Sequence, residues 1–145
     1  MVRKVLCVDT EDRVSSVLAA INNEKNLTAI GATSVENARD VINKEPVVGV
    51  VTSYSLPDGS GMDVIQSVRE HIPQTPVVLF TDVSPAEIDT QSFEEVLVEY
   101  LNRELPDATD RLGFIMNDII DHSAQVGFLT PDDEDERLKA LKQYD

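Results

Sequence analysis

Polar and charged residues follow directly on apolar runs at several points along the chain, and these residues could do chemistry. The first run ends in a carboxylate, a later one in hydroxyls, and the last is followed by a guanidinium. Such residues line ligand sites when the runs are parallel strands, because ligands bind beyond the carboxyl ends of an open sheet. The candidates are Asp9, Thr10, Glu11, Ser53, Ser55, Thr81, Asp82, Tyr100 and Arg103.

The elements that must position these residues alternate between strand and helix signals. Short apolar runs predict five strands, at residues 2–8, 27–33, 46–52, 75–81 and 96–101. Between them, apolar residues recur at the spacing of an amphipathic helix, first at Val14, Val17, Leu18 and Ile21. Alternating units of this length predict a parallel sheet with helices on both faces and right-handed crossovers.

Helix start signals mark four of the helical segments. Ser34 is the expected cap of the second helix, and Ser60 with Asp63 that of the third. The segment 84–87, Ser-Pro-Ala-Glu, is a capping box with proline at the first helical position, so it predicts a fourth helix. Asp107 is the expected cap of the fifth.

Composition limits the class of protein. The length of 145 residues predicts one domain, and the absence of a long apolar run or a signal peptide predicts a cytoplasmic protein. The formal charge of −15 argues against nucleic-acid binding by this segment. Self-repulsion at that charge lowers stability and is screened by salt, so the sequence fits either an ordinary acidic domain or adaptation to high salt. Cys7, in an apolar run, is expected to be a buried thiol.

Four segments resemble the receiver domain of two-component response regulators. "KVLCVDTEDRV" resembles its first strand, "VVTSYSLPDGSGMDVI" its phosphorylation strand and loop, "PVVLFTD" its switch-threonine strand, and "VEYLNRE" its last strand. The resemblance covers residues 1–124 and implies a CheY-like, flavodoxin-like (βα)5 three-layer sandwich. Its five-stranded parallel sheet would have the order 2-1-3-4-5. Such a domain is a regulatory module rather than an enzyme, and no P-loop, dinucleotide fingerprint or nucleophile elbow is present.

The phosphorylation chemistry that the resemblance implies is broken at several positions. Receivers phosphorylate an aspartate at the position of Ser53, beside a Mg²⁺ ion held by that aspartate and an acidic pair. Here Asp9 keeps one acid of the pair, but Thr10 replaces the other and Arg103 replaces a lysine. Because Mg²⁺ requires hard anionic ligands, we expect weak or absent Mg²⁺ binding, no cofactor, and a pseudo-receiver.

Alternatives remain at these positions. One interpretation is that Ser53 closes its strand by hydrogen bonding. The other is that Ser53 or a nearby carboxylate accepts a phosphoryl group from a histidine kinase, which would make the chain a phospho-receiver with an unusual acceptor. Asp9 is free to pair with Arg103, and Glu11 to replace the missing acid. Asp58 and Asp63, beyond Pro57, are expected in turn and helix-start roles rather than in the pocket. His71 and His122 are expected at the surface.

The retained Thr81 and Tyr100 correspond to the switch pair that in receivers couples the pocket to the surface of the fourth helix, fifth strand and fifth helix. Their other interpretation is a hydroxyl that closes a strand and an aromatic residue at the sheet edge. We expect this surface to bind a protein partner: an attached sensor or output domain, a second copy, or a kinase or adaptor. No membrane contact is expected.

The tail differs from the rest of the chain. Residues 125–145 predict an acidic linker helix that leads to a missing C-terminal domain. Their "DEDERLKALKQYD" resembles the lead-in to GAF sensor domains, and with the acidity this favours the N-terminal piece of a haloarchaeal signalling protein.

Overall fold

The computed structural model describes residues 3–88 and 96–126, and within them five parallel strands form one sheet. The strands are β1 (Arg3–Val8), β2 (Leu27–Ala32), β3 (Val47–Thr52), β6 (Val77–Thr81) and β7 (Val98–Asn102). Their spatial order is β2-β1-β3-β6-β7, which confirms the order predicted from the sequence. Each predicted strand is present, with ends that differ by one or two residues.

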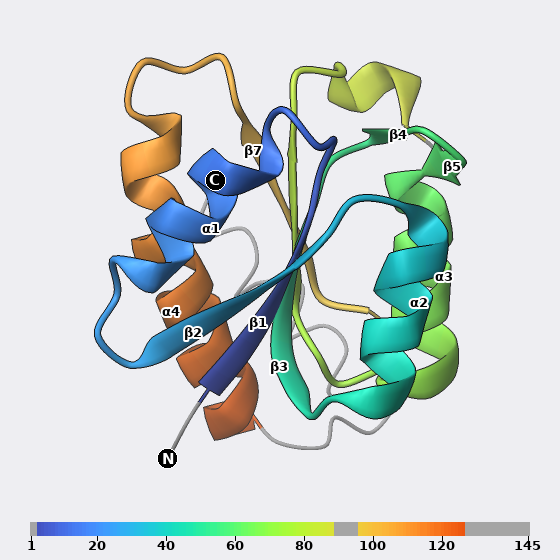
Figure 1. Cartoon of the computed structure of the whole chain (residues 1–145). Helices are drawn as coiled ribbons and strands as arrows, with labels where there is room; N and C mark the ends of the chain where they lie inside the picture. The colour runs from blue at the N-terminus through green and yellow to red at the C-terminus, as the bar shows by residue number, and fades with distance from the viewer. Residues whose placement is uncertain (1–2, 89–95, 127–145) are drawn as a thin grey trace.

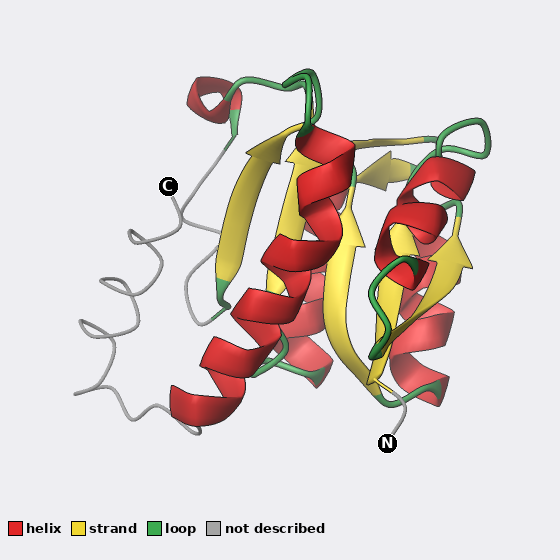
Figure 2. Cartoon of the chain, turned by 90° about the vertical axis from the view of Figure 1, so that its left-hand side faces the viewer, coloured by secondary structure: helices red, strands yellow, loops and turns green. Residues whose placement is uncertain are grey.

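Helices cover both faces of this sheet. On one face lie α1 (Val14–Asn22) and α4 (Ala108–Val126), and on the other lie α2 (Val35–Lys44) and α3 (Gly61–His71), as Figure 1 shows. Figure 2 shows α4 in front of the sheet, along the strands. The molecule therefore has three layers, with an apolar core on each face of the sheet.

The central strands are apolar on both faces because both faces are covered. Val5 and Cys7 of β1 pack toward α1 and α4, while Leu6 and Val8 pack toward α2 and α3. On β3, Gly49 brings α4 close, since a Cβ atom there would lie 2.6 Å from the sulfur of Met116. Cys7 is buried as predicted, and burial raises the pKa of its thiol to about 12.

The predicted caps of the second and third helices are confirmed. The Ser34 hydroxyl accepts a hydrogen bond from the amide of Asn37 at the start of α2. At the start of α3, the Ser60 hydroxyl accepts from the amide of Met62, and the Asp63 carboxylate accepts from the amide of Ser60. Each bond satisfies an amide that the helix leaves without an internal partner.

The fourth predicted helix is wrong over the residues that are described. The Ser84 hydroxyl does accept a hydrogen bond from the amide of Ala86, but the turn that follows is a single 3₁₀ turn, η1 (Pro85–Glu87). Ile88 already has an extended backbone. The prediction failed here because capping residues specify where a helix begins and not how far it continues. The rest of that predicted helix, the linker helix and the GAF-like segment lie outside the described residues.

A two-stranded hairpin was not predicted. It consists of β4 (Ser55–Leu56) and β5 (Gly59–Ser60), which pair antiparallel between β3 and α3. In the described residues, no helix is long and apolar enough to cross a membrane.

Candidate functional site

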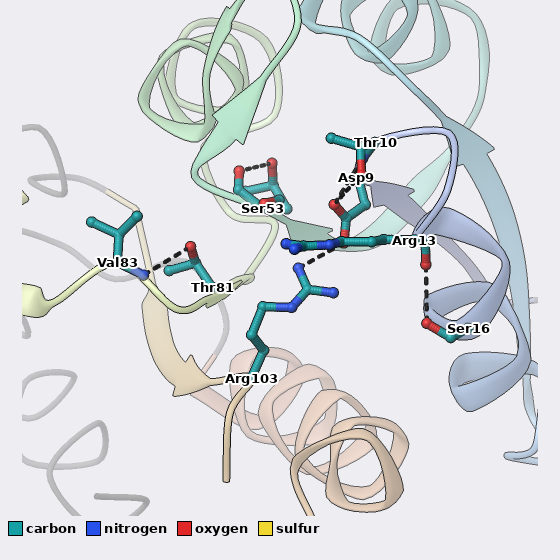
Figure 3. Close-up of polar contacts among 9 residues, drawn as sticks. Asp9, Thr10, Arg13, Ser16, Ser53, Thr81, Val83 and Arg103 are labelled. Carbon is teal, nitrogen blue, oxygen red and sulfur yellow. Dashed lines mark hydrogen bonds and ion pairs between the residues drawn. The ribbon is translucent and has the colours of Figure 1, made fainter.

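The strand ends bring together residues from distant parts of the sequence. Asp9 follows β1, Ser53 follows β3, Thr81 ends β6 and Arg103 follows β7 (Figure 3). The backbone ladder continues one residue past three of these strands. The amide of Asp9 donates to Ala32, that of Ser53 to Val8, and that of Arg103 to Thr81. These bonds hold the side chains at the carboxyl edge of the sheet, where the sequence predicted them.

Asp9 is a buried carboxylate with partners on both oxygens. Its side chain is 1% exposed, and its Oδ2 atom lies 2.9 Å from Nη1 of Arg103. Its Oδ1 atom accepts a hydrogen bond of 2.7 Å from the amide of Thr10. A carboxylate buried this deeply would be costly without a counter-charge. The structure supplies that charge within the chain, so the interpretation of Asp9 as the ion-pair partner of Arg103 is confirmed.

Arg103 is held on a second side by an aromatic ring. Its guanidinium carbon lies 5.0 Å from the centre of the Phe80 ring, within the range of a cation–π contact. Its side chain is 13% exposed, so it is largely shielded from water. A guanidinium stacks on a ring and pairs with a carboxylate at the same time, which the smaller ammonium of a lysine does less well.

Ser53 stands at the end of β3 as a neutral, buried residue. It is 4% exposed, and its backbone oxygen accepts a hydrogen bond of 3.0 Å from the Thr52 hydroxyl. Gly61 at the start of α3 packs directly against that oxygen, where any Cβ atom would collide with it. Ser53 is therefore enclosed by the loop and helix that follow it.

Two further predicted site residues, Glu11 and Ser55, are exposed. Glu11 lies in the turn before α1, and its replacement of the acid that Thr10 lacks stays a prediction. Ser55 lies in β4, where it pairs with Ser60. Both residues follow the strand ends by two or three positions, where the chain has left the sheet.

Two charged residues in the turn before α1, Asp12 and Arg13, were missed. The pKa of Asp12 is lowered, first by a hydrogen bond from the Thr10 side chain and further by the positive charges of Arg13 and Arg103. Arg13 is exposed, and Figure 3 draws it at the same carboxyl edge of the sheet as Asp9 and Arg103. The available signal was the Glu-Asp-Arg run that continues after Thr10, which reads equally well as an exposed helix start.

The two switch-like residues contact the same neighbour. The Tyr100 hydroxyl donates a hydrogen bond of 2.7 Å to the backbone oxygen of Val83, and the amide of Val83 donates one of 3.3 Å to the Thr81 hydroxyl. The pKa of Tyr100 is raised by burial and by the negative charges of Asp82 and Glu104. Thr81 and Tyr100 thus hold the segment after β6 from two sides.

The remaining carboxylates near the hairpin have the structural roles that were predicted. Asp58 accepts hydrogen bonds from the amides of Val35 and Glu36, at 2.8 and 3.1 Å, and so caps α2 from a distant loop. The same bonds lower its pKa. Asp63 completes the cap of α3.

The histidines are remote from the strand ends. His71 is exposed at the far end of α3, as predicted. His122, near the C-terminal end of α4, is only partly at the surface: its side chain is half-buried and its Nε2 atom is shielded from solvent. Neither helix end approaches Ser53.

Comparison with known proteins assigns the chain to one family. The sequence profile described as "Response regulator receiver domain" matches residues 5–110. The chain belongs to that family. A receiver domain is a signalling module rather than an enzyme.

One sequence relative agrees with this assignment, and two solved structures agree with the fold. The chain is 30% identical over 101 residues to the response regulator protein PilR of Pseudomonas aeruginosa, a match that spans 70% of this chain and 23% of PilR. A CheY-like receiver domain protein from Methanospirillum hungatei has a TM-score of 0.76 at 16% identity, covering 88% of this chain and all of that one. The response regulator TrrA from Thermotoga maritima, solved in complex with Mg²⁺ and BeF, has a TM-score of 0.66 at 18% identity. That match covers 81% of this chain and 98% of TrrA.

The Mg²⁺ ion of a receiver domain does not fit the residues present here. In the described part of the chain, no three carboxylate, histidine or cysteine side chains are grouped as a metal site. Asp9 is the one buried carboxylate at these strand ends, and its Oδ2 atom is occupied by Arg103. Mg²⁺ requires several oxygen ligands in near-octahedral geometry, which this single carboxylate does not supply.

Proposed function

We propose that this receiver domain works as a phosphorylation-independent protein-interaction module of a two-component signalling protein. The observation that carries the proposal is the ion pair between Asp9 and Arg103. It lies at the strand ends, where receivers bind Mg²⁺ and the phosphoryl group. The pocket is already charge-balanced without a metal ion or a phosphoryl group. The residues around Asp9 can therefore keep one arrangement without a metal ion or a phosphoryl group.

The nucleophile supports the same proposal. An aspartyl phosphate forms when a carboxylate attacks phosphorus, with positive charge nearby to neutralise the phosphoryl oxygens. Ser53 carries a hydroxyl, which is a weak nucleophile unless a general base removes its proton. Asp9 is the buried carboxylate at these strand ends, and its two oxygens already accept hydrogen bonds from the Thr10 amide and the Arg103 guanidinium.

The surface formed by η1, β7 and α4 is the proposed docking site. It corresponds to the surface of the fourth helix, fifth strand and fifth helix expected from the sequence. Tyr100 fixes the segment before η1 through Val83, which supports a docking surface that does not depend on phosphorylation. Two large apolar side chains are exposed on or next to α4, Leu105 at 44% and Phe114 at 67%. The partner would be an attached sensor or output domain, a second copy, or a kinase or adaptor.

The net charge of the domain supports a proposal about the salt concentration in which it works. A domain with a formal charge of −15 would work in a cytoplasm of high salt, where counter-ions screen its self-repulsion. The same charge disfavours nucleic acid as a partner of this segment.

The test of phosphorylation independence uses acetyl phosphate with Mg²⁺, followed by intact mass, and beryllofluoride with Mg²⁺, followed by amide spectra. We expect no mass gain and no saturable shift at Asp9, Ser53 or Thr81. A receiver with an intact acceptor aspartate is the positive control. A mass gain that disappears in Ser53→Ala would instead assign Ser53 as an unusual acceptor and overturn the proposal.

A further inference from the structure

The face where α1 packs beside the edge strand β2 differs in charge from the rest of the surface. In the described residues, α1 is the one α-helix without a charged side chain, whereas α2, α3 and α4 each carry charges of both signs. The edge strand β2 carries no charge either. We infer that a second copy of the chain docks on this face through a two-fold contact. The surface of η1, β7 and α4 stays open for a different partner, so the inference does not rest on the proposed function.

The uncharged residues of α1 and β2 form one continuous surface. A Cβ atom at Gly31 would lie 3.3 Å from Cδ1 of Leu18, and one turn further along α1 the Asn22 side chain accepts a hydrogen bond of 2.9 Å from the amide of Ala29. Figure 1 shows α1 and β2 next to each other. The α1–β2 face consists of the exposed or half-buried residues Ser15, Leu18, Ala19, Asn22, Ala29 and Gly31.

The backbone of β2 determines how a partner would meet this face. β2 is an outer strand of the sheet, and in the described residues no strand pairs with its outer side. Two of its amides are already satisfied outside the sheet, that of Ala29 by Asn22 and that of Leu27 by the backbone oxygen of Glu24 at 3.1 Å. A partner would therefore contact the side chains of the α1–β2 face and would not extend the sheet.

The charge of the whole chain favours a second copy as the occupant. Each copy has a formal charge of −15, so two copies repel each other wherever carboxylates would meet. The α1–β2 face brings no carboxylate into the contact. A two-fold contact places the same patch on both sides, so the patch must complement itself. Hydroxyl and amide side chains such as Ser15 and Asn22 do so, because each can donate and accept.

The charges that flank α1 fit an antiparallel pair of these helices. Glu11 and Asp12 are exposed just before α1, and Lys25 is exposed just after it. A two-fold axis near Ala19 would bring the acidic end of one α1 toward Lys25 of the other copy. Because α1 has 9 residues and is about 14 Å long, the contact is smaller than a standard interface. We therefore expect weak association, with a Kd on the order of 0.1 mM.

The experiment is sedimentation equilibrium of the whole chain at protein concentrations up to about 1 mM, in about 0.1 M and about 2 M potassium chloride. We expect a monomer–dimer equilibrium that shifts toward the dimer at the higher salt, because salt screens the repulsion between the two copies. Amide spectra recorded over the same concentrations should shift at Ala19, Asn22 and Gly31.

Two lysine substitutions separate the face from the net charge. Ala19→Lys makes the chain less negative but places two like charges near the two-fold axis, so the dimer should weaken by about tenfold or more. Thr109→Lys makes the same change of net charge at an exposed position of α4, and should leave the dimer as strong or slightly stronger. Ser15→Lys repeats the first measurement on the α1–β2 face.

The same assay on Phe114→Ala tests the other surface, because Phe114 is exposed on α4. This variant should dimerise like the natural chain. The inference is overturned if the natural chain stays monomeric at both salt concentrations, or if folded Ala19→Lys and Ser15→Lys proteins dimerise as strongly as the natural chain. Loss of the dimer in Phe114→Ala with its retention in Ala19→Lys also overturns it, and would place the second copy on α4 instead.

Discussion

Breaking the pair of Asp9 and Arg103 should cost a large part of the stability of the domain. In Arg103→Met, Asp9 keeps its hydrogen bond from Thr10 but loses its counter-charge while 1% exposed. Removing one partner of a buried ion pair costs about 3–5 kcal/mol. Arg103 itself is 13% exposed, so water can reach part of the vacated space, and we reduce the expected loss to about 2–4 kcal/mol. For a chain of this size, that corresponds to a fall in Tm of roughly 5–15 °C.

The assay is urea unfolding followed by circular dichroism, at low and at high potassium chloride. Arg13→Met is the matched control, since it removes the same charge from an exposed side chain, and its midpoint should stay close to that of the natural chain. A double-mutant cycle with Asp9→Asn then isolates the coupling between the two residues. The reasoning is refuted if Arg103→Met loses less than about 1 kcal/mol, the value of an exposed pair.

Four further outcomes are expected. Asp58→Asn should flatten the acid limb of stability: the folded pKa of Asp58 is lowered, so its contribution is present above the unfolded pKa and is lost as pH falls through the folded pKa. Urea midpoints between neutral pH and pH of about 2.5 measure this, and equal acid limbs would contradict it. Gly61→Ala should lower the urea midpoint, because its Cβ atom would collide with the backbone oxygen of Ser53; an unchanged midpoint would show that the loop relaxes. Cys7, with a pKa of about 12, should resist alkylation at pH 8 in the folded protein and react once unfolded, as mass spectrometry can follow. The Tm should rise steeply from low to multimolar salt at a charge of −15, and a flat profile would discard salt adaptation.

The strands and most helix starts were predictable because their signals are local. The run at 46–52 is apolar on both faces, which only a covered central strand tolerates, and Ser34 and Ser60 bind amides within three residues. The segment 84–87 carried equally good start signals, yet only a 3₁₀ turn follows in the described residues. Helix length depends on packing that a start signal does not encode.

The site was predictable only in part, for a related reason. Asp9, Ser53, Thr81 and Arg103 follow strands, so the parallel sheet itself brings them together. Glu11 and Ser55 lie a residue or two further on, where the path of the loop decides and periodicity is silent. The stacking of Arg103 on Phe80 depends on which face of β6 the Phe80 ring occupies. The lowered pKa of Asp12 depends on the turn before α1, which no sequence pattern specified.

The separation of the ion-pair partners along the chain also bears on how the domain assembles. Asp9 and Arg103 lie 94 positions apart, and β1 sits inside the sheet while β7 forms one of its edges. Arg103 reaches Asp9 only when β7 is docked beside β6. A compact state that lacks β7 would leave Asp9 without its counter-charge, so the buried carboxylate disfavours such states and couples β1 to the edge of the sheet.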